Sequence, residues 1–127
     1  MQTKIIIDST VDLIPELKAR TTVVPLTVHF GEEEYIDGVT ITHQQFYEKL
    51  VETDVLPRTS QASPVAFAKA YKEVAQSGCQ AVVLTVSETF SGTYQSAMIA
   101  AQDYEDVIVV DTGSVAIGAG ILAEYAL

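Results

Sequence analysis

The stretch QAVVLTV, residues 80–86, decides the fold that this sequence predicts. Five of its seven residues are apolar and none is charged, which is typical of a strand buried on both faces of a parallel sheet. Residues 4–7 (KIII) and 107–110 (VIVV) are similar short runs, and we expect the second of them to be buried as well. Segments with helical periodicity separate these runs, which indicates strand–helix–strand units. We therefore expect an α/β fold: a three-layer α/β/α sandwich with a mainly parallel sheet.

Two helix starts carry clear capping signals. Thr42 and Gln45 form a T-x-x-Q capping box at the start of one helix. A second helix begins at Ser63, directly before Pro64, and ends at Gly78. The apolar side chains of the first helix recur on one face: Phe46, Tyr47, Leu50 and Val51.

The remaining elements have weaker signals. One strand is expected over residues 22–30, where Pro25 indicates an edge position or a bulge. The other expected elements are a short helix over residues 12–20, a loop over residues 54–61, a helix that begins at residues 91–93 and a final helix that runs to Leu127. The helix after residue 93 is expected to bury Tyr94, Ala97, Met98 and Ala101.

Length and composition bound what the chain can be. With 127 residues, 48% of them apolar and 19% charged, it suits one domain with a single core. No apolar run approaches the ~20 residues that a membrane helix needs, and no signal peptide precedes the first strand. We therefore expect a cytoplasmic protein with no integral membrane segment. The lone Cys79 is expected to be a buried apolar residue at the start of a strand, without a catalytic role.

The net charge of −10 argues against nucleic acid as a partner. No Lys or Arg follows Lys72, whereas seven acidic residues do. Binding to a phosphate backbone needs a basic footprint, which this chain does not offer. An acidic, solvated surface accounts for most of the charge.

Four polar segments lie where expected strands give way to helices, or close to such points: residues 8–10, 58–63, 87–93 and 111–114. The carboxyl ends of parallel strands form the usual ligand-binding edge of an open α/β sheet. A helix N-terminus offers unpaired N–H groups and about half an elementary positive charge, so that hydroxyls and glycine beside it can bind a carboxylate or phosphate without Lys or Arg. Such residues also serve as plain helix caps, and the pattern alone leaves both interpretations open.

Motifs for enzyme chemistry are missing from the sequence. It contains neither a G-x-S-x-G elbow nor a G-x-x-x-x-G-K-[ST] loop, and its glycines do not form a G-x-G-x-x-G motif. The two histidines and one cysteine show no metal-ligand spacing, and no nucleophile is assembled with a base. Asp8 and Asp111 follow expected strands, where they could hold Mg²⁺ in a small-molecule phosphate-ester enzyme, although capping explains both. We expect no metal and no cofactor.

Two of the polar segments resemble motifs of the DegV family. Residues 59–64 (TSQASP) resemble the T-S-Q-P-S segment of that family, and residues 91–97 (SGTYQSA) match its S-G-T-Y-x-S-A segment. Further similarity runs along the whole chain, at residues 8–10, 24–26, 35–38 and 111–112 and at Gly118 and Gly120. The order and spacing of two distinctive motifs make the resemblance specific.

The resemblance implies a protein that binds a long-chain fatty acid in a tunnel between two domains. By motif match, Thr59 and Ser91 are the expected carboxylate ligands, with Ser60, the backbone of Gly92 and the hydroxyl of Thr93 as neighbours. The loaded protein would present the carboxyl group to a separate ATP-dependent fatty acid kinase, which makes an acyl phosphate for fatty acid metabolism and phospholipid synthesis. The chain would then be a carrier and not an enzyme. A non-catalytic regulatory domain with degenerate loops is the other alternative.

The chain departs from the family pattern in two ways. Ala62 replaces a proline, which loosens the loop but removes no hydrogen-bond donor. Family members are also about twice as long, so residues 1–127 are expected to form the amino-terminal lipid-binding domain without the second domain. That second domain would supply further polar and basic contacts to the carboxylate and much of the acyl tunnel.

Overall fold

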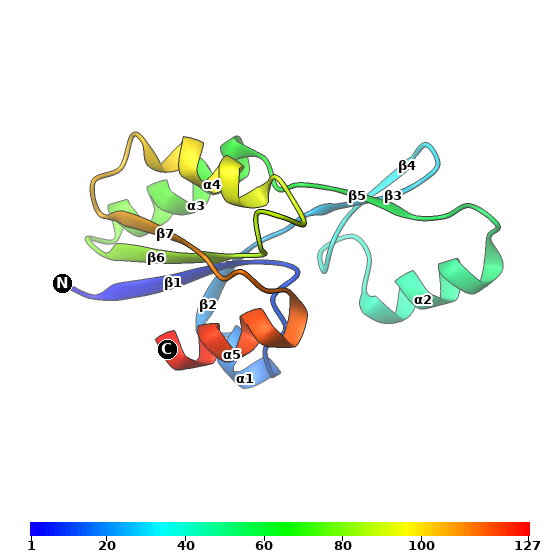
Figure 1. The fold of residues 1–127 in the computed structure, drawn as a ribbon, viewed down its shortest axis with the longest axis horizontal. Helices are drawn as coiled ribbons and strands as arrows, with labels where there is room; N and C mark the ends of the chain where they lie inside the picture. The colour runs from blue at the N-terminus through cyan, green and yellow to red at the C-terminus, as the bar shows by residue number, and fades with distance from the viewer.

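A four-stranded parallel sheet forms the centre of the molecule in the computed structural model, which describes residues 1–127. Its strands are β1 (Thr3–Asp8), β2 (Thr21–Val24), β6 (Gln80–Thr85) and β7 (Val107–Asp111), in the order β2-β1-β6-β7. Ile5 of β1 pairs with Thr21 and with Val82, so β1 has parallel neighbours on both sides. The apolar runs that predicted this sheet thus form its central and edge strands (Figure 1).

Helices cover both faces of the sheet, which confirms the expected three-layer α/β/α sandwich. Helices α3 (Pro64–Gln76) and α4 (Thr93–Ala101) lie on one face, and α1 (Pro15–Lys18) and α5 (Ala116–Ala126) lie on the other (Figure 1). The hydroxyl of the fully buried Tyr71 on α3 donates to a carbonyl oxygen of α4 over 3.1 Å. No helix combines the length and apolar character that crossing a membrane would require.

The sheet divides the expected core into two hydrophobic clusters. Ile6 and Val83 lie in a cluster of 13 buried residues with α3 and α4. Ile7 and Leu84 are their chain neighbours and lie in a cluster of 6 buried residues with α5. This alternation follows from the pleat, which directs successive side chains to opposite faces. Cys79 is 7% exposed at the start of β6, as predicted.

A second, smaller sheet projects from the sandwich. It is antiparallel, has the order β4-β3-β5, and consists of β3 (Thr27–Phe30), β4 (Glu33–Ile36) and β5 (Arg58–Ser60). Together with α2 (His43–Glu52) it forms an extension that we call the arm, residues 27–60 (Figure 1). Three buried residues hold the arm together, with Tyr35 and Phe46 packed beside them: Val28, Phe30 and Ile41.

The single strand expected over residues 22–30 is wrong. The chain leaves the parallel sheet after Val24 and enters the antiparallel sheet at Thr27. Pro25 has no N–H to donate to a ladder, and the N–H of Leu26 donates instead to the side chain of Ser9 over 3.0 Å. The proline therefore follows an edge strand, as one of the two expectations had it, and marks a change of sheet and not a bulge.

The loop expected over residues 54–61 is also partly wrong, because Arg58–Ser60 pairs with β3. A three-residue polar strand carries no apolar alternation, so its pattern could not be recognised. The helix expected over residues 12–20 is present but has only four residues, Pro15–Lys18.

Helix caps follow the sequence closely. The capping box of α2 is present, with the Gln45 N–H donating to the Thr42 hydroxyl over 3.1 Å. The Ser63 hydroxyl accepts from the N–H of Ala66, and Gly78 after α3 has a φ of +70°. These local signals are confirmed because capping depends only on residues within one turn.

The burial of individual side chains was predicted less well than the positions of the helix caps. Helix α2 buries no residue, and its Val51 is 87% exposed. On α4, Met98 is exposed and not buried. Ile108 and Val110 of β7 are exposed because β7 is an edge strand and α5 lies over β1 and β6.

Candidate functional site

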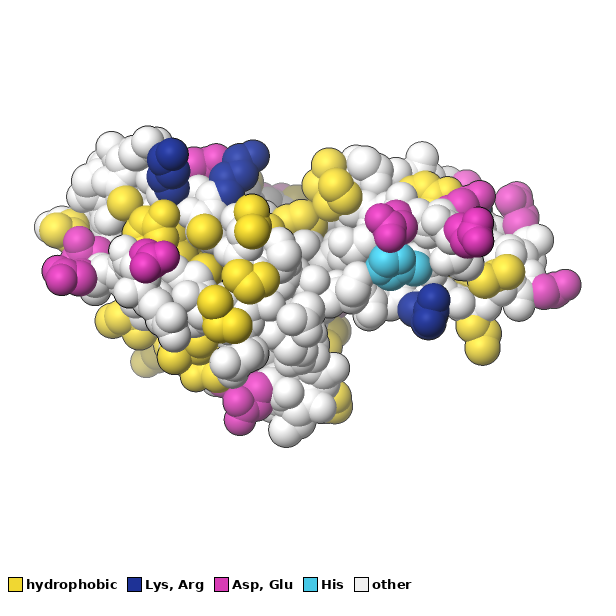
Figure 2. All heavy atoms as spheres, turned by 90° about the horizontal axis from the view of Figure 1, so that it is seen from above, with side chains coloured by type: hydrophobic (Ala, Val, Ile, Leu, Met, Phe, Trp, Pro, Cys, Tyr) yellow, Lys and Arg dark blue, Asp and Glu magenta, His cyan; other side chains and the backbone are white.

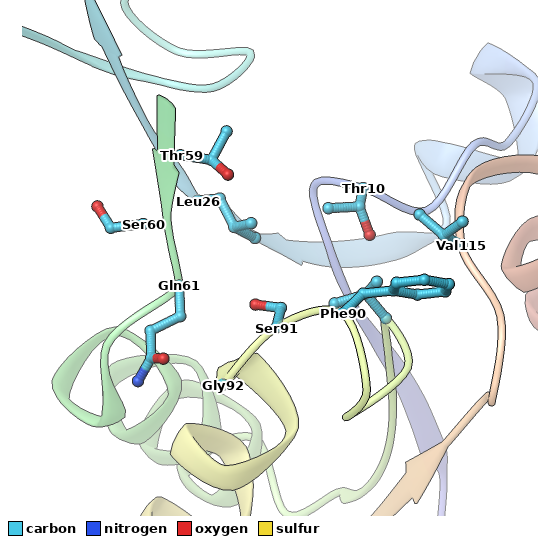
Figure 3. A pocket seen from close by; sticks show the side chains of 10 residues that line it. Thr10, Leu26, Thr59, Ser60, Gln61, Phe90, Ser91, Gly92 and Val115 are labelled. Carbon is cyan, nitrogen blue, oxygen red and sulfur yellow. The ribbon is translucent and has the colours of Figure 1, made fainter. Parts of the chain in front are cut away.

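A pocket of about 500 Å³ opens between the arm and the carboxyl ends of the parallel strands. Its walls come from six separate segments of the chain (Figure 3). The lining residues are Thr10, Leu26, Thr59, Ser60, Gln61, Val86, Phe90, Ser91, Gly92 and Val115. The pocket therefore lies at the edge where an open α/β sheet usually binds its ligands.

The pocket brings Thr59 and Ser91 together from two different parts of the fold. Thr59 lies on β5 at the base of the arm, and Ser91 lies two residues before the start of α4. Both side chains line the space between β5 and the loop that precedes α4 (Figure 3). Gly92, which follows Ser91, is the N-cap residue of α4 and also lines the pocket.

Thr93 supports Ser91 from below the pocket surface. Its side chain is fully buried and is not among the lining residues. The hydroxyls of Ser91 and Thr93 are 2.9 Å apart, and the N–H of Thr93 donates to the Ser91 hydroxyl over 3.2 Å. Thr93 thus fixes the rotamer of Ser91.

Ser60 differs from Thr59 in the direction of its side chain. Successive residues of a strand point to opposite faces, and the Ser60 hydroxyl points away from Ser91 (Figure 3). Its oxygen lies 2.6 Å from Nε2 of His29, and Nδ1 of His29 lies 3.6 Å from a carboxylate oxygen of Glu34. Neighbouring strands thus bring a hydroxyl and an imidazole within hydrogen-bonding distance, a pairing that the spacing of the two residues in the sequence did not predict.

Asp8 joins the ends of two central strands beneath the pocket. This residue is fully buried; one carboxylate oxygen accepts from the N–H and the hydroxyl of Thr10, and the other accepts from the N–H of Val86 over 2.6 Å. Burial raises the pKa of Asp8, and these hydrogen bonds oppose that effect. Asp8 thereby places both Thr10 and Val86 in the pocket wall.

Asp111 acts as a turn residue beside the neighbouring strand. Its carboxylate accepts from the N–H of Gly113 over 2.9 Å. Asp8 and Asp111 both accept hydrogen bonds from nearby backbone, and neither belongs to a cluster of three or more potential metal-ligating side chains.

The pocket is electrically neutral but has acidic surroundings. None of its lining residues carries a formal charge. An adjoining pocket of about 350 Å³ shares Thr10 and Thr59 with it and includes Asp12, Asp37 and His43. An anion in the first pocket would therefore depend on hydroxyl and backbone N–H donors.

Four apolar residues complete the wall: Leu26, Val86, Phe90 and Val115. The sequence did not single out these four residues as ligands. Thr10, Gln61 and Phe90 do lie in the polar segments 8–10, 58–63 and 87–93 that were expected near the binding edge. Phe90 offered a signal in the sequence, because it is the one phenylalanine within the polar segment 87–93; in the structure it is 69% exposed. The apolar side chains lie among the hydroxyls around the pocket (Figure 3).

The model of the DegV family matches residues 2–127. The chain belongs to the DegV family. A DegV domain-containing protein from Clostridium perfringens is 39% identical to it over 94% of this chain and 44% of the relative. A DegV family protein from Thermus thermophilus, described by its fatty acid binding, has a TM-score of 0.89 and 36% identity over 99% of this chain and 46% of that one.

A second similar structure is the Fatty Acid Kinase (Fak) B3 protein of Streptococcus pneumoniae, loaded with linoleic acid. It has a TM-score of 0.81 and 25% identity over 98% of this DegV-family chain and 47% of the neighbour. The chain thus spans less than half the length of each of these relatives.

Proposed function

We propose that this DegV-family chain binds a long-chain fatty acid, with the carboxylate held at the pocket between β5 and α4. The observation that carries the proposal is that Thr59 and Ser91 line the same pocket, whose lining is uncharged and partly apolar. The Thr59 and Ser91 hydroxyls donate to the carboxylate, the backbone of Gly92 lies beside them, and Thr93 holds Ser91 in place. Ser60 flanks the site.

Helix α4 adds to the attraction for a carboxylate. Its N-cap residue is Gly92, which has no side chain that could cap the first turn. The N-terminal N–H groups of a helix carry about half an elementary positive charge. Neutral donors of this kind bind an anion without a lysine or arginine.

The acyl tail supplies most of the binding free energy. Each buried CH₂ group contributes roughly 0.8 kcal/mol before entropic costs, so a 16-carbon chain has ample driving force. Leu26, Phe90 and Val115 form an apolar surface where the tail begins. The carboxylate site then mainly sets the orientation of the ligand.

We also propose that residues 1–127 act as the amino-terminal domain of a two-domain protein. The relatives are more than twice as long, which supports this arrangement. Apolar side chains stand exposed on β7 and α5, where a second domain could cover them: Ile108, Ile117, Ile121 and Tyr125. The second domain would supply the rest of the acyl tunnel.

The protein acts, in this proposal, as a cytoplasmic carrier that needs no metal or cofactor. It presents the carboxyl group to a separate ATP-dependent fatty acid kinase. The similarity to the linoleic-acid-loaded Fak B3 protein supports this role. Catalysis would then belong to the kinase.

Carboxyl-labelled ¹³C-palmitic acid bound to the full-length protein tests the site. We expect Thr59→Ala combined with Ser91→Ala to shift the carboxyl resonance and to slow transfer to the kinase more than it reduces lipid retention. Ser77→Ala is the matched control, since its hydroxyl donates to the Val74 carbonyl oxygen at the end of α3 and does not line the pocket. Equal losses of retention and transfer, or an unmoved resonance in the double variant, would contradict the proposal.

The domain proposal has its own test. The isolated 127-residue chain should retain fatty acid weakly after bacterial expression, because part of the tunnel wall is absent. Native mass spectrometry measures the bound lipid directly. Stoichiometric lipid on the isolated chain would refute the shared tunnel while leaving the carboxylate site intact.

A further inference from the structure

The side chain of Gln61 connects the base of the arm with the first turns of α4. Its Nε2 donates to the hydroxyl of Ser96 over 3.1 Å, and Ser96 is 1% exposed. Its Oε1 occupies the space beside Gly92, where an added Cβ would lie only 1.8 Å from that oxygen (Figure 3). Gln61 therefore makes a specific hydrogen bond and a close steric contact with the same helix.

The backbone of Gly92 does not itself require glycine. Its φ of −74° and ψ of 6° are accessible to any residue. The position is crowded because the Gln61 carboxamide occupies the space that a side chain would take. The glycine of the S-G-T segment and the glutamine of the T-S-Q segment thus form one interlocking pair.

Gln61, the residue that directly follows the arm, makes a side-chain hydrogen bond to α4. Every side-chain hydrogen bond made by residues 27–60 stays within the arm, and so do its two ion pairs. Gln61 follows β5 directly and is two residues from Thr59. Displacement of its side chain would therefore move Thr59 relative to Ser91.

We infer that Gln61 is a positioning residue: held against Gly92 and hydrogen bonded to Ser96, it sets the distance between Thr59 and Ser91 and hence the orientation of the bound carboxylate. The part of the inference that concerns the orientation of the carboxylate rests on the proposed function. The part that concerns the distance between Thr59 and Ser91 describes the geometry of the protein itself and can be tested without ligand.

Three variants of the full-length protein separate the two contacts: Gln61→Ala, Gly92→Ala and the double variant. Gln61→Ala removes the carboxamide, and Gly92→Ala expels it. Each single change should shift the ¹³C carboxyl resonance of bound palmitic acid. In the double variant the new methyl group fills the emptied space, so Gly92→Ala should add little to the effect of Gln61→Ala. Gln95→Ala is the matched control, because Gln95 is exposed on the same helix.

The ligand-free protein gives a second measurement. Spin labels at Val51→Cys on the arm and Met98→Cys on α4, in a Cys79→Ser background, report the distance between the two parts. We expect Gln61→Ala and Gly92→Ala to broaden or shift that distance distribution and Gln95→Ala to leave it unchanged.

The two measurements distinguish the ways in which the inference could fail. A changed label distance with an unmoved carboxyl resonance would support Gln61 as the link between arm and helix and count against the proposed carboxylate site. A moved resonance with an unchanged distance would mean that Gln61 acts on the ligand directly, which overturns the positioning role. No change in either, or additive effects in the double variant, would overturn the inference altogether.

Discussion

Asp8 is a fully buried carboxyl group that accepts three hydrogen bonds, from the N–H and hydroxyl of Thr10 and from the N–H of Val86. A carboxylate can accept on both of its oxygens, whereas an amide side chain offers one acceptor and one donor. An aspartate at this position can therefore accept all three hydrogen bonds, whereas an asparagine cannot. We expect a substitution of Asp8 to change the stability of the fold more than it changes the pocket.

Asp8→Asn should lower the free energy of unfolding by about 1–3 kcal/mol, because an NH₂ group would face the buried N–H of Val86 or of Thr10. Urea unfolding of both proteins near neutral pH measures the loss. Asp111→Asn is the control, since Asp111 is partly exposed and hydrogen bonds to a turn. A loss no larger than that of the control would contradict the structural role of Asp8.

The same residue predicts a pH dependence. Burial raises the pKa of Asp8 above its ordinary value of 3.8, so the folded protein binds this proton more readily than the unfolded chain does. The stability contributed by Asp8 therefore increases as the pH falls through the raised pKa, and the gain is complete below 3.8. The stability difference between wild type and Asp8→Asn should accordingly widen as the pH falls through the raised pKa towards 3.8. A difference that narrows on acidification would contradict the direction of the shift.

At the scale of the element, α2 and α3 share the same kind of cap but differ in what they bury. Thr42 and Ser63 each accept a hydrogen bond from the backbone N–H three residues on. Helix α3 buries four residues of the large core cluster, whereas α2 buries none. Equivalent caps should therefore have different consequences.

Ser63→Ala should cost about 1 kcal/mol of global stability, because α3 unfolds only with the core. Thr42→Ala should destabilise α2 by a similar amount but speed amide hydrogen exchange in α2 alone, with little change in the urea midpoint. Hydrogen exchange followed by mass spectrometry, together with urea unfolding, distinguishes the two. Equal midpoint shifts would mean that the arm and sandwich unfold together.

Some helices and strands could be predicted well from the sequence, and others could not be predicted at all. Helix caps and the strands β1, β6 and β7 could be predicted, although the burial of β7 could not. The groups that form a cap are neighbours in the chain, and each of these strands contains a continuous apolar run. The division of residues 22–30 into two strands at Pro25 could not be predicted, because a proline is compatible with an edge strand, a bulge or a change of sheet. Strand β5 was missed because its pairing with β3 joins residues about thirty positions apart, at Val28 and Thr59.

The whole molecule consists of a sandwich with two substantial hydrophobic clusters and an arm with three buried residues. Figure 2 shows acidic side chains over the arm, and its exposed acidic residues are Glu32, Glu33, Glu34, Glu48, Glu52 and Asp54. A small core and a high charge density favour local opening. We therefore expect the arm to be the less protected part of the protein.

Two matched valine substitutions test this division. Val83→Ala in the sandwich should lower global stability by at least about 2 kcal/mol, because it leaves a cavity in the main core. Val28→Ala should chiefly increase hydrogen exchange in residues 27–60. Both valines are buried, at 0% and 5% exposure, so burial itself does not explain a difference. Loss of protection throughout the sandwich in Val28→Ala would show that the two parts are not separable.

The amino-acid sequence by itself determined the parallel α/β sandwich, most helix ends and the two motifs that meet at the pocket, because each depends on local backbone chemistry or on a run of apolar residues. Only the tertiary structure decided that the chain builds an arm, that Ser60 pairs with His29 and points away from Ser91, and that Gln61 fills the space left by Gly92. Those facts depend on which distant segments become neighbours. A side chain's direction on a short polar strand, and the free volume beside a glycine, exist only once the strands have paired and the helices have packed.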